Sequence, residues 1–155
     1  MLATSIKQIN EWGAARCITT NGTLEGQWFK LISEIGELAD NLAKKKDITD
    51  DVGDIFVVLC MIAGVENISI EKAFELSVPV GGQDADFLGQ MLIVAGRLRF
   101  SALCDVSSLG DMINCLRGIS YAHNLRFDEC VGFAYDQIKD RKGALTKDGV
   151  FIKES

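Results

Sequence analysis

The chain has 155 residues, 48% of them hydrophobic, and a formal net charge of −6. This length suffices for one domain with its own hydrophobic core, without stabilising disulfides or metals. The acidic balance, with no basic run, argues against nucleic acid and anionic membranes as partners.

Apolar residues recur with helical periodicity along most of the chain, which indicates an all-α fold. Pro79 and Gly81-Gly82 form the one linker-like segment in the middle. The end of the chain is not amphipathic, and Lys147-Asp148-Gly149-Val150 predicts a turn followed by a short extended stretch. The predicted helices span about residues 4–17, 24–45, 49–66, 70–78, 84–103, 107–123 and 127–141.

The sequence also indicates the cellular compartment of the protein. The N-terminal residues do not resemble a signal peptide, and the longest apolar stretch, Ile55 to Ala63, is too short to cross a bilayer. The five cysteines are scattered without a Cys-x-x-Cys motif, so we expect reduced core residues and a cytoplasmic protein.

Two acidic pairs on consecutive predicted helices are the most informative feature. Glu34 and Glu37 are three residues apart, as are Asp51 and Asp54, so each pair lies on one helix face. The segment between the pairs is long enough for a turn between antiparallel helices, which would bring the pairs to similar heights. Four converging carboxylates require a counter-charge, and Mg²⁺ with oxygen ligands is the natural one.

The residues around the two acidic pairs favour a metal site over a simpler interpretation, in which the acids are solvated or cap a helix. A single Glu-x-x-Glu usually marks a solvated face, and acids at the start of a helix, such as Asp50 and Asp51, often act as caps. Here the acidic stripe also contains Gln27, Lys30 and Asn41 and borders the apolar stripe instead of opposing it. The helix after Asp54 is apolar on all sides, which predicts a buried position.

The chain also contains a possible internal repeat. A shift of 57 residues places Asp54 on Asp111 and preserves the apolar pattern of a helix pair. The other acids are lost, since Glu34 falls on Met91 and Glu37 on Val94. We therefore predict one domain, residues 1–155, built as a helical bundle from two related hairpins: an active half at about 23–78, a degenerate half at about 83–141, and a tail at 142–155. Ser108-Leu-Gly-Asp111 is interpreted as a capping box.

Together these motifs resemble the MazG-like all-α nucleoside triphosphate pyrophosphohydrolases, whose signature is Glu-Glu-x-x-Glu, a spacer and Glu-x-x-Asp. The resemblance covers residues 4–78 and 124–154 in patches, and the middle, 79–123, is unlike the short family members. Its C-terminal part consists of residues 134–143 and 148–153. Two positions depart from the signature: Ser33 replaces its first glutamate, and Asp51 stands where glutamate is usual.

The resemblance implies hydrolysis of a nucleoside triphosphate to the monophosphate and pyrophosphate with Mg²⁺ or Mn²⁺. Glu34, Glu37, Asp51 and Asp54 would be the catalytic metal ligands, and Lys139 and Arg141 would bind phosphate, beside Gln27, Lys30 and Asn41 as substrate contacts.

The substrate and the assembly are less constrained. We expect a dNTP, with dGTP favoured because Ile55 and Val58 would offer a flat apolar wall. A dUTP- or dCTP-specific enzyme and a non-catalytic nucleotide- or metal-binding module are the alternatives. Because the helix at 49–66 is apolar on more sides than one hairpin covers, we also expect a homo-oligomer, either a dimer or a tetramer.

Overall fold

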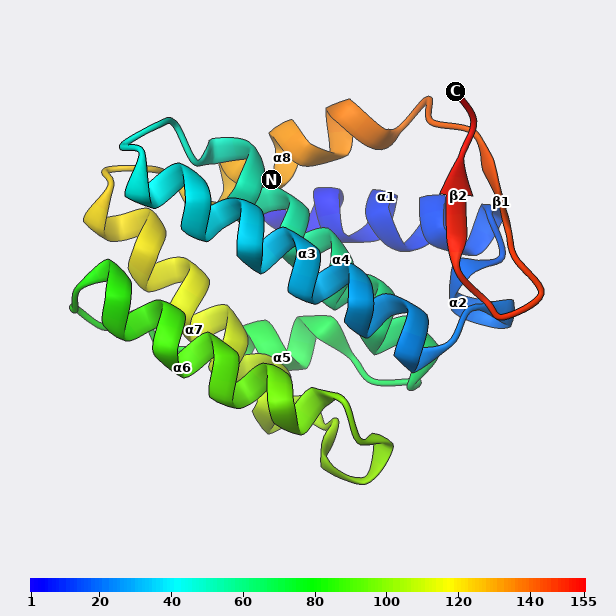
Figure 1. Cartoon of the computed structure of the whole chain (residues 1–155), viewed down its shortest axis with the longest axis horizontal. Helices are drawn as coiled ribbons and strands as arrows, with labels where there is room; N and C mark the ends of the chain where they lie inside the picture. The colour runs from blue at the N-terminus through cyan, green and yellow to red at the C-terminus, as the bar shows by residue number, and fades with distance from the viewer.

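The computed structural model describes all 155 residues and has an all-α architecture with a small C-terminal β-hairpin (Figure 1). Its elements are α1 (Leu2–Ala15), α2 (Ile18–Asn21), α3 (Leu24–Ala43), α4 (Thr49–Val65), α5 (Ile70–Leu76), α6 (Asp84–Leu98), the 3₁₀ helix η1 (Ser101–Leu103), α7 (Val106–Ala122), α8 (Phe127–Ile138), β1 (Gly143–Leu145) and β2 (Phe151–Lys153). None of the helices combines the length and apolar character needed to cross a bilayer.

The seven predicted helices are present, with ends that differ from the predicted ones by at most five residues, and the short helix α2 was not predicted. Two of the differences have a clear cause in the backbone. The first predicted helix ends at Ala15, because Cys17 adopts a left-handed backbone conformation (φ 58°) before α2 begins. The helix predicted over 84–103 ends at Leu98, where the chain turns through an extended Phe100 into η1. In both places the apolar periodicity of the sequence continues beyond the residue at which the helix ends.

Side-chain caps fix the starts of three helices. Thr23 accepts a hydrogen bond from the amide of Gly26 at the start of α3, and Ser69 caps α5 in the same way. At α7 the cap is Asp105, whose carboxylate accepts from the amide of Ser108 at 2.8 Å. The capping box predicted at Ser108 and Asp111 is therefore wrong, since Ser108 lies inside the helix.

Helix α4 forms the centre of the molecule. Its residues from Ile55 to Ala63 are all buried, as its apolar sequence predicts. The helices packed around it are α1, α2, α3, α5, α7 and α8. A single chain thus covers the apolar stretch of α4 from Ile55 to Ala63, so the apolar character of this helix is no argument for a homo-oligomer.

Two helix pairs lie side by side in the bundle (Figure 1). Helix α3 packs along α4, and α6 packs along α7. The pairs meet through α3 and α6, where the indole nitrogen of Trp28 donates a hydrogen bond to the carbonyl of Ala95 at 2.8 Å. Trp28, which is partly buried, thus packs between the two helix pairs. The predicted relation of the pairs by duplication stays a prediction.

The C-terminal hairpin folds back onto the start of the chain. Strands β1 and β2 are antiparallel, with Ala144 opposite Ile152, and the predicted turn between them includes Gly149 at φ 79°. The hydroxyl of Thr23 donates to the carbonyl of Asp148 at 3.3 Å, and Phe151 meets Trp12 edge to face at 5.9 Å. These contacts hold the hairpin beside α1 and the start of α3.

Candidate functional site

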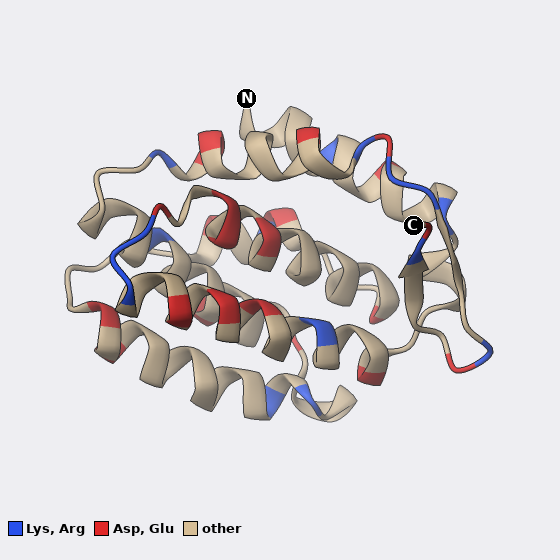
Figure 2. Ribbon diagram, turned by 45° about the horizontal axis from the view of Figure 1, so that its top comes forward, with Lys and Arg blue, Asp and Glu red and all other residues tan.

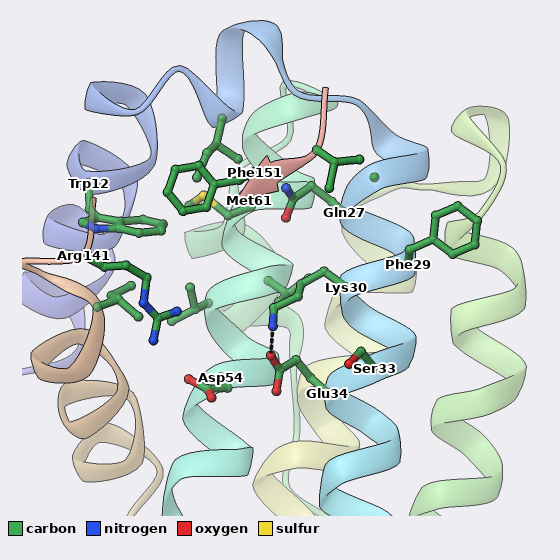
Figure 3. A pocket seen from close by; sticks show the side chains of 16 residues that line it. Trp12, Gln27, Phe29, Lys30, Ser33, Glu34, Asp54, Met61, Arg141 and Phe151 are labelled. Atoms are coloured by element: carbon green, nitrogen blue, oxygen red, sulfur yellow. Dashed lines mark ion pairs between the residues drawn. The ribbon is translucent and has the colours of Figure 1, made fainter. Parts of the chain in front are cut away.

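A cavity of about 330 Å³ lies where α1, α2, α3, α4, the end of α8 and the hairpin meet (Figure 3). Figure 3 shows charged side chains at one end and aromatic and apolar ones at the other. Its size falls within the range usual for small-molecule sites. The lining residues are Trp12, Ile18, Gly26, Gln27, Phe29, Lys30, Ser33, Glu34, Asp54, Val57, Val58, Met61, Ile138, Arg141, Val150 and Phe151.

Glu34 is the most constrained acid of the site. Its side chain is 4% exposed, and one oxygen, Oε1, forms an ion pair with Lys30 Nζ at 2.5 Å. The other oxygen, Oε2, is buried and has no hydrogen-bond partner. A buried carboxylate oxygen without a partner is costly, so this atom marks a place where a bound cation or donor would be stabilised.

Asp54 lies across the charged end from Glu34, on α4 (Figure 3). Burial, and then the negative charges of Asp50 and Glu34, raise the pKa of Asp54 to about 7, although Lys30 and Arg141 act in the opposite direction. The charge of this carboxylate is therefore destabilised in the protein alone. A divalent cation would reverse that effect.

Asp51 is held by Asn41. The Asn41 amide nitrogen donates to both Asp51 oxygens, at 2.9 and 3.1 Å. Asp51 is 6% exposed, and its burial raises its pKa while the Asn41 hydrogen bond lowers it. Asn41, predicted as a substrate contact, thus orients the carboxylate of Asp51. Asn41 does not line the cavity.

Two further acids surround this group. Glu37 is exposed on α3, and the charge of Glu34, followed by burial, raises its pKa. The pKa of Asp50 is also raised, by burial and then by Glu34, while Arg141 lowers it. Figure 2 shows the acids of α3 and α4 on neighbouring turns of adjacent helices. Asp50, for which helix capping is the simpler interpretation, does not line the cavity, but its charge acts on Asp54 four residues away on the same helix.

Of the two predicted phosphate-binding cations in the tail, Arg141 lines the cavity and Lys139 does not. The Lys139 ammonium pairs with Asp136 at 2.9 Å on the surface. Arg141 is positioned by Arg16, whose guanidinium donates to the backbone carbonyls of Arg141, at 2.7 Å, and Lys139, at 3.2 Å. The Arg16 guanidinium also stacks over the Trp12 ring. Through these contacts Arg16 joins α1 to the end of α8.

In this conformation, no three Asp, Glu, His or Cys side chains converge closely enough to form a ready-made metal centre. The oxygen donors and the unpartnered Glu34 oxygen nevertheless suit a hard cation. Mg²⁺ in particular is commonly held by one or two carboxylates together with substrate phosphates. The donor set therefore fits a cation that enters with its substrate.

The glycines inside the acidic pairs play different parts. A side chain at Gly53 would collide with the carbonyl of Cys130, so Gly53 permits close packing of α4 against α8. Gly36 has no atom near the place where its side chain would be, and it faces open space. Neither glycine therefore brings α3 and α4 closer together.

The apolar end of the cavity was not predicted. It is formed by Trp12, Met61 and Phe151, together with Val58, from parts of the chain far apart in sequence. Of the two residues expected to form an apolar wall, Val58 lines the cavity, whereas Ile55 is fully buried elsewhere in the core. Residues from α1 and the hairpin meet here only through the tertiary fold, and no local pattern announces them.

Comparisons with known proteins add one relative. Over 60 residues, 37% of this chain, the sequence is 40% identical to an uncharacterized 18.2 kDa protein in the rep-hol intergenic region of Haemophilus phage HP1. The match spans 37% of the length of that curated relative. No family model matches the chain. No solved structure matches it either.

Proposed function

We propose that this protein hydrolyses a nucleoside triphosphate to the monophosphate and pyrophosphate with the help of Mg²⁺ or Mn²⁺. The carrying observation is the unpartnered, buried oxygen of Glu34, which faces a cavity shared with Asp54 and two cations, Lys30 and Arg141. The resemblance of the two acidic pairs to the MazG-like signature supports the same reaction.

Side chains in and beside the cavity would divide the work of this reaction. Glu34 and Asp54, which line the cavity, would hold the cation together with Glu37 and Asp51, which do not line it. The cation would neutralise phosphate charge and acidify a bound water. Arg141 offers a bidentate donor pair for phosphate oxygens, and Lys30 offers a point charge. One of the carboxylates accepts the proton of the attacking water. Water adds to the α-phosphorus, the bond from that atom to the oxygen bridging to the β-phosphorus breaks, and pyrophosphate leaves.

A panel of the eight common NTPs and dNTPs with Mg²⁺ or Mn²⁺ tests the reaction directly, with pyrophosphate release as the readout. Glu34→Gln should remove activity, because the neutral amide keeps the shape but loses the charge. Glu75→Gln is the matched control, since Glu75 is exposed on α5 away from the cavity. Full wild-type activity in excess chelator would refute the metal requirement.

A non-catalytic binding module is the second candidate function. It is favoured by the absence of a ready-made metal centre and by the ion pair that occupies one oxygen of Glu34. Calorimetric binding of a dNTP with Mg²⁺, without pyrophosphate release from any member of the panel, would establish this alternative.

For the base we propose a purine, dGTP first, because the apolar end of the cavity is broad and lined by Trp12, Met61 and Phe151. Values of kcat/KM for dGTP, dATP, dCTP and dUTP test this preference. A tenfold preference for dUTP or dCTP, about 1.4 kcal/mol of discrimination, would favour a pyrimidine-specific enzyme instead.

We also propose a homo-oligomer in the cytoplasm. Leu92, Ile93 and Phe100, on and after α6, are 57%, 70% and 59% exposed, and such a row is a candidate contact between copies. All five cysteines are free, as suits a reducing compartment. Sedimentation analysis should find an oligomer that Ile93→Lys dissociates, and a wild-type monomer would contradict the proposal.

A further inference from the structure

The two ends of the cavity have opposite chemistry, and a polar side chain separates them. The charged end contains Glu34, Asp54 and Arg141, and the apolar end contains Met61 and Phe151. A triphosphate with its cation suits the charged end, because the apolar end offers no charged group, and its one unpartnered donor is the indole nitrogen of Trp12. The remainder of such a substrate must then point toward the apolar end.

Gln27 is the polar side chain at the boundary. It projects from α3 into the cavity between Lys30 and the aromatic residues (Figure 3). The residue is 6% exposed and lines the cavity, and its amide is not among the fully buried side-chain atoms that lack a partner. Its donor and acceptor atoms therefore remain accessible to a ligand in the cavity.

Resting on the proposed function, we infer that the apolar end binds the nucleobase and that Gln27 reads the base edge. An amide presents a donor and an acceptor side by side, which matches the adjacent acceptor and donor atoms on a base edge. The rings of Trp12 and Phe151, and the thioether of Met61, supply the flat and polarisable surroundings that a heteroaromatic ring requires.

The C-terminal hairpin is part of this compartment. Val150 lies just before strand β2 and Phe151 begins the strand, and both residues line the cavity. The turn is packed tightly against α3, since a side chain at Gly26 would lie 3.1 Å from the Gly149 carbonyl oxygen. The hairpin therefore forms one wall of the base compartment, and Phe151 contributes to affinity for every base.

Two variants and a control separate base reading from general packing. Gln27→Met preserves the size of the side chain and removes its polar atoms, and Phe151→Ala removes the aromatic wall. Gln137→Met makes the same change at an exposed position of α8 outside the cavity. The readouts are kcat/KM for the four dNTPs and calorimetric binding of their α,β-imido analogues with Mg²⁺, with melting temperature as the check on folding.

We expect Gln27→Met to lower kcat/KM for the preferred dNTP at least tenfold. The kcat/KM values for the four dNTPs should then differ less from one another than they do in the wild type. Phe151→Ala should weaken all four analogues, and Gln137→Met should match the wild type. Hydrolysis of inorganic tripolyphosphate, which has no base, should fall less in Gln27→Met than hydrolysis of the preferred dNTP does. If Gln27→Met does not fold, the uniform loss expected in Phe151→Ala tests the same compartment.

The outcomes distinguish this inference from the proposed function. Wild-type affinity and base discrimination in both cavity variants would overturn the base compartment while leaving hydrolysis intact. Base-selective analogue binding that Gln27→Met abolishes, in a protein that releases no pyrophosphate, would support the compartment and refute the pyrophosphohydrolase.

Discussion

The α3–α4 pair and the α6–α7 pair are similar in packing and opposite in chemistry. In the first pair a buried acid, Glu34, keeps an oxygen without a partner. In the second, Met91 at the corresponding position is fully buried in the core, and the remaining acid, Asp111, is neutralised by Arg97 at 3.0 Å. A buried charged atom without a partner is thus found only in the α3–α4 pair, and we interpret the α6–α7 pair as scaffold.

The largest expected difference between the pairs is in turnover. Asp54→Ala should lower kcat by about 100- to 1,000-fold or more, because it removes charge from the reacting site. The fold should survive, since the raised pKa of Asp54 shows that its charge is unfavourable in the protein alone. Asp111→Ala, at the corresponding position of the second pair, is the control and should keep wild-type kcat. Equal losses in both variants would contradict the division into site and scaffold.

A core substitution in the α6–α7 pair should lower stability and leave turnover unchanged. Met91→Ala should lower the free energy of unfolding by about 2–5 kcal/mol, because it opens a cavity at a fully buried position. Denaturant unfolding measures this loss, and kcat per folded molecule should not change. A folded Met91→Ala protein with impaired turnover would show that the second pair takes part in the reaction.

The acids of the first pair also predict a pH dependence in the absence of metal. The pKa of Asp54 rises from its ordinary 3.8 to about 7 in the folded protein, and the pKa values of Glu37, Asp50 and Asp51 are raised as well. A raised carboxyl pKa favours folding at low pH, so this stabilisation is lost as pH increases from about 4 to about 7.

Thermal unfolding in chelator over this pH interval measures the loss. Asp54→Asn should show a smaller loss of stability than the wild type, and Mg²⁺ at pH 7 should restore stability to the wild type more than to the variant. Identical pH profiles for the two proteins would contradict the burial of an unfavourable charge at this position.

The smallest effects should come from the ion pairs. Arg97→Met should change the free energy of unfolding by less than about 1 kcal/mol, because both partners are more than two-fifths exposed. Lys30→Met should cost more, since it leaves the buried Glu34 without its cation. Chemical denaturation of both variants compares them, and the reverse order would show that Glu34 is better solvated than its burial indicates.

The sequence predicted what depends on local pattern. The helices follow from apolar periodicity and the acidic stripe from residue spacing, so the elements of α3 and α4 were placed to within a few residues. Helix capping is a local explanation for Asp50, whereas the coupling of this residue to Glu34 depends on the packing of two helices. Trp12 and Phe151 could not be identified, because their contact joins the two ends of the fold and leaves no spacing rule.

The attachment of Arg16 to the backbone carbonyl of Arg141 has a consequence for biosynthesis. These residues are separated by 125 positions, and the arginine proposed to hold phosphate is fixed only when both segments are present. Helices α1 to α4 leave the ribosome long before Arg141 does, so a nascent chain can bury part of its apolar core without assembling a complete cavity. The proposed phosphate site would then be complete only after Arg141 has emerged, and shorter nascent chains would lack it.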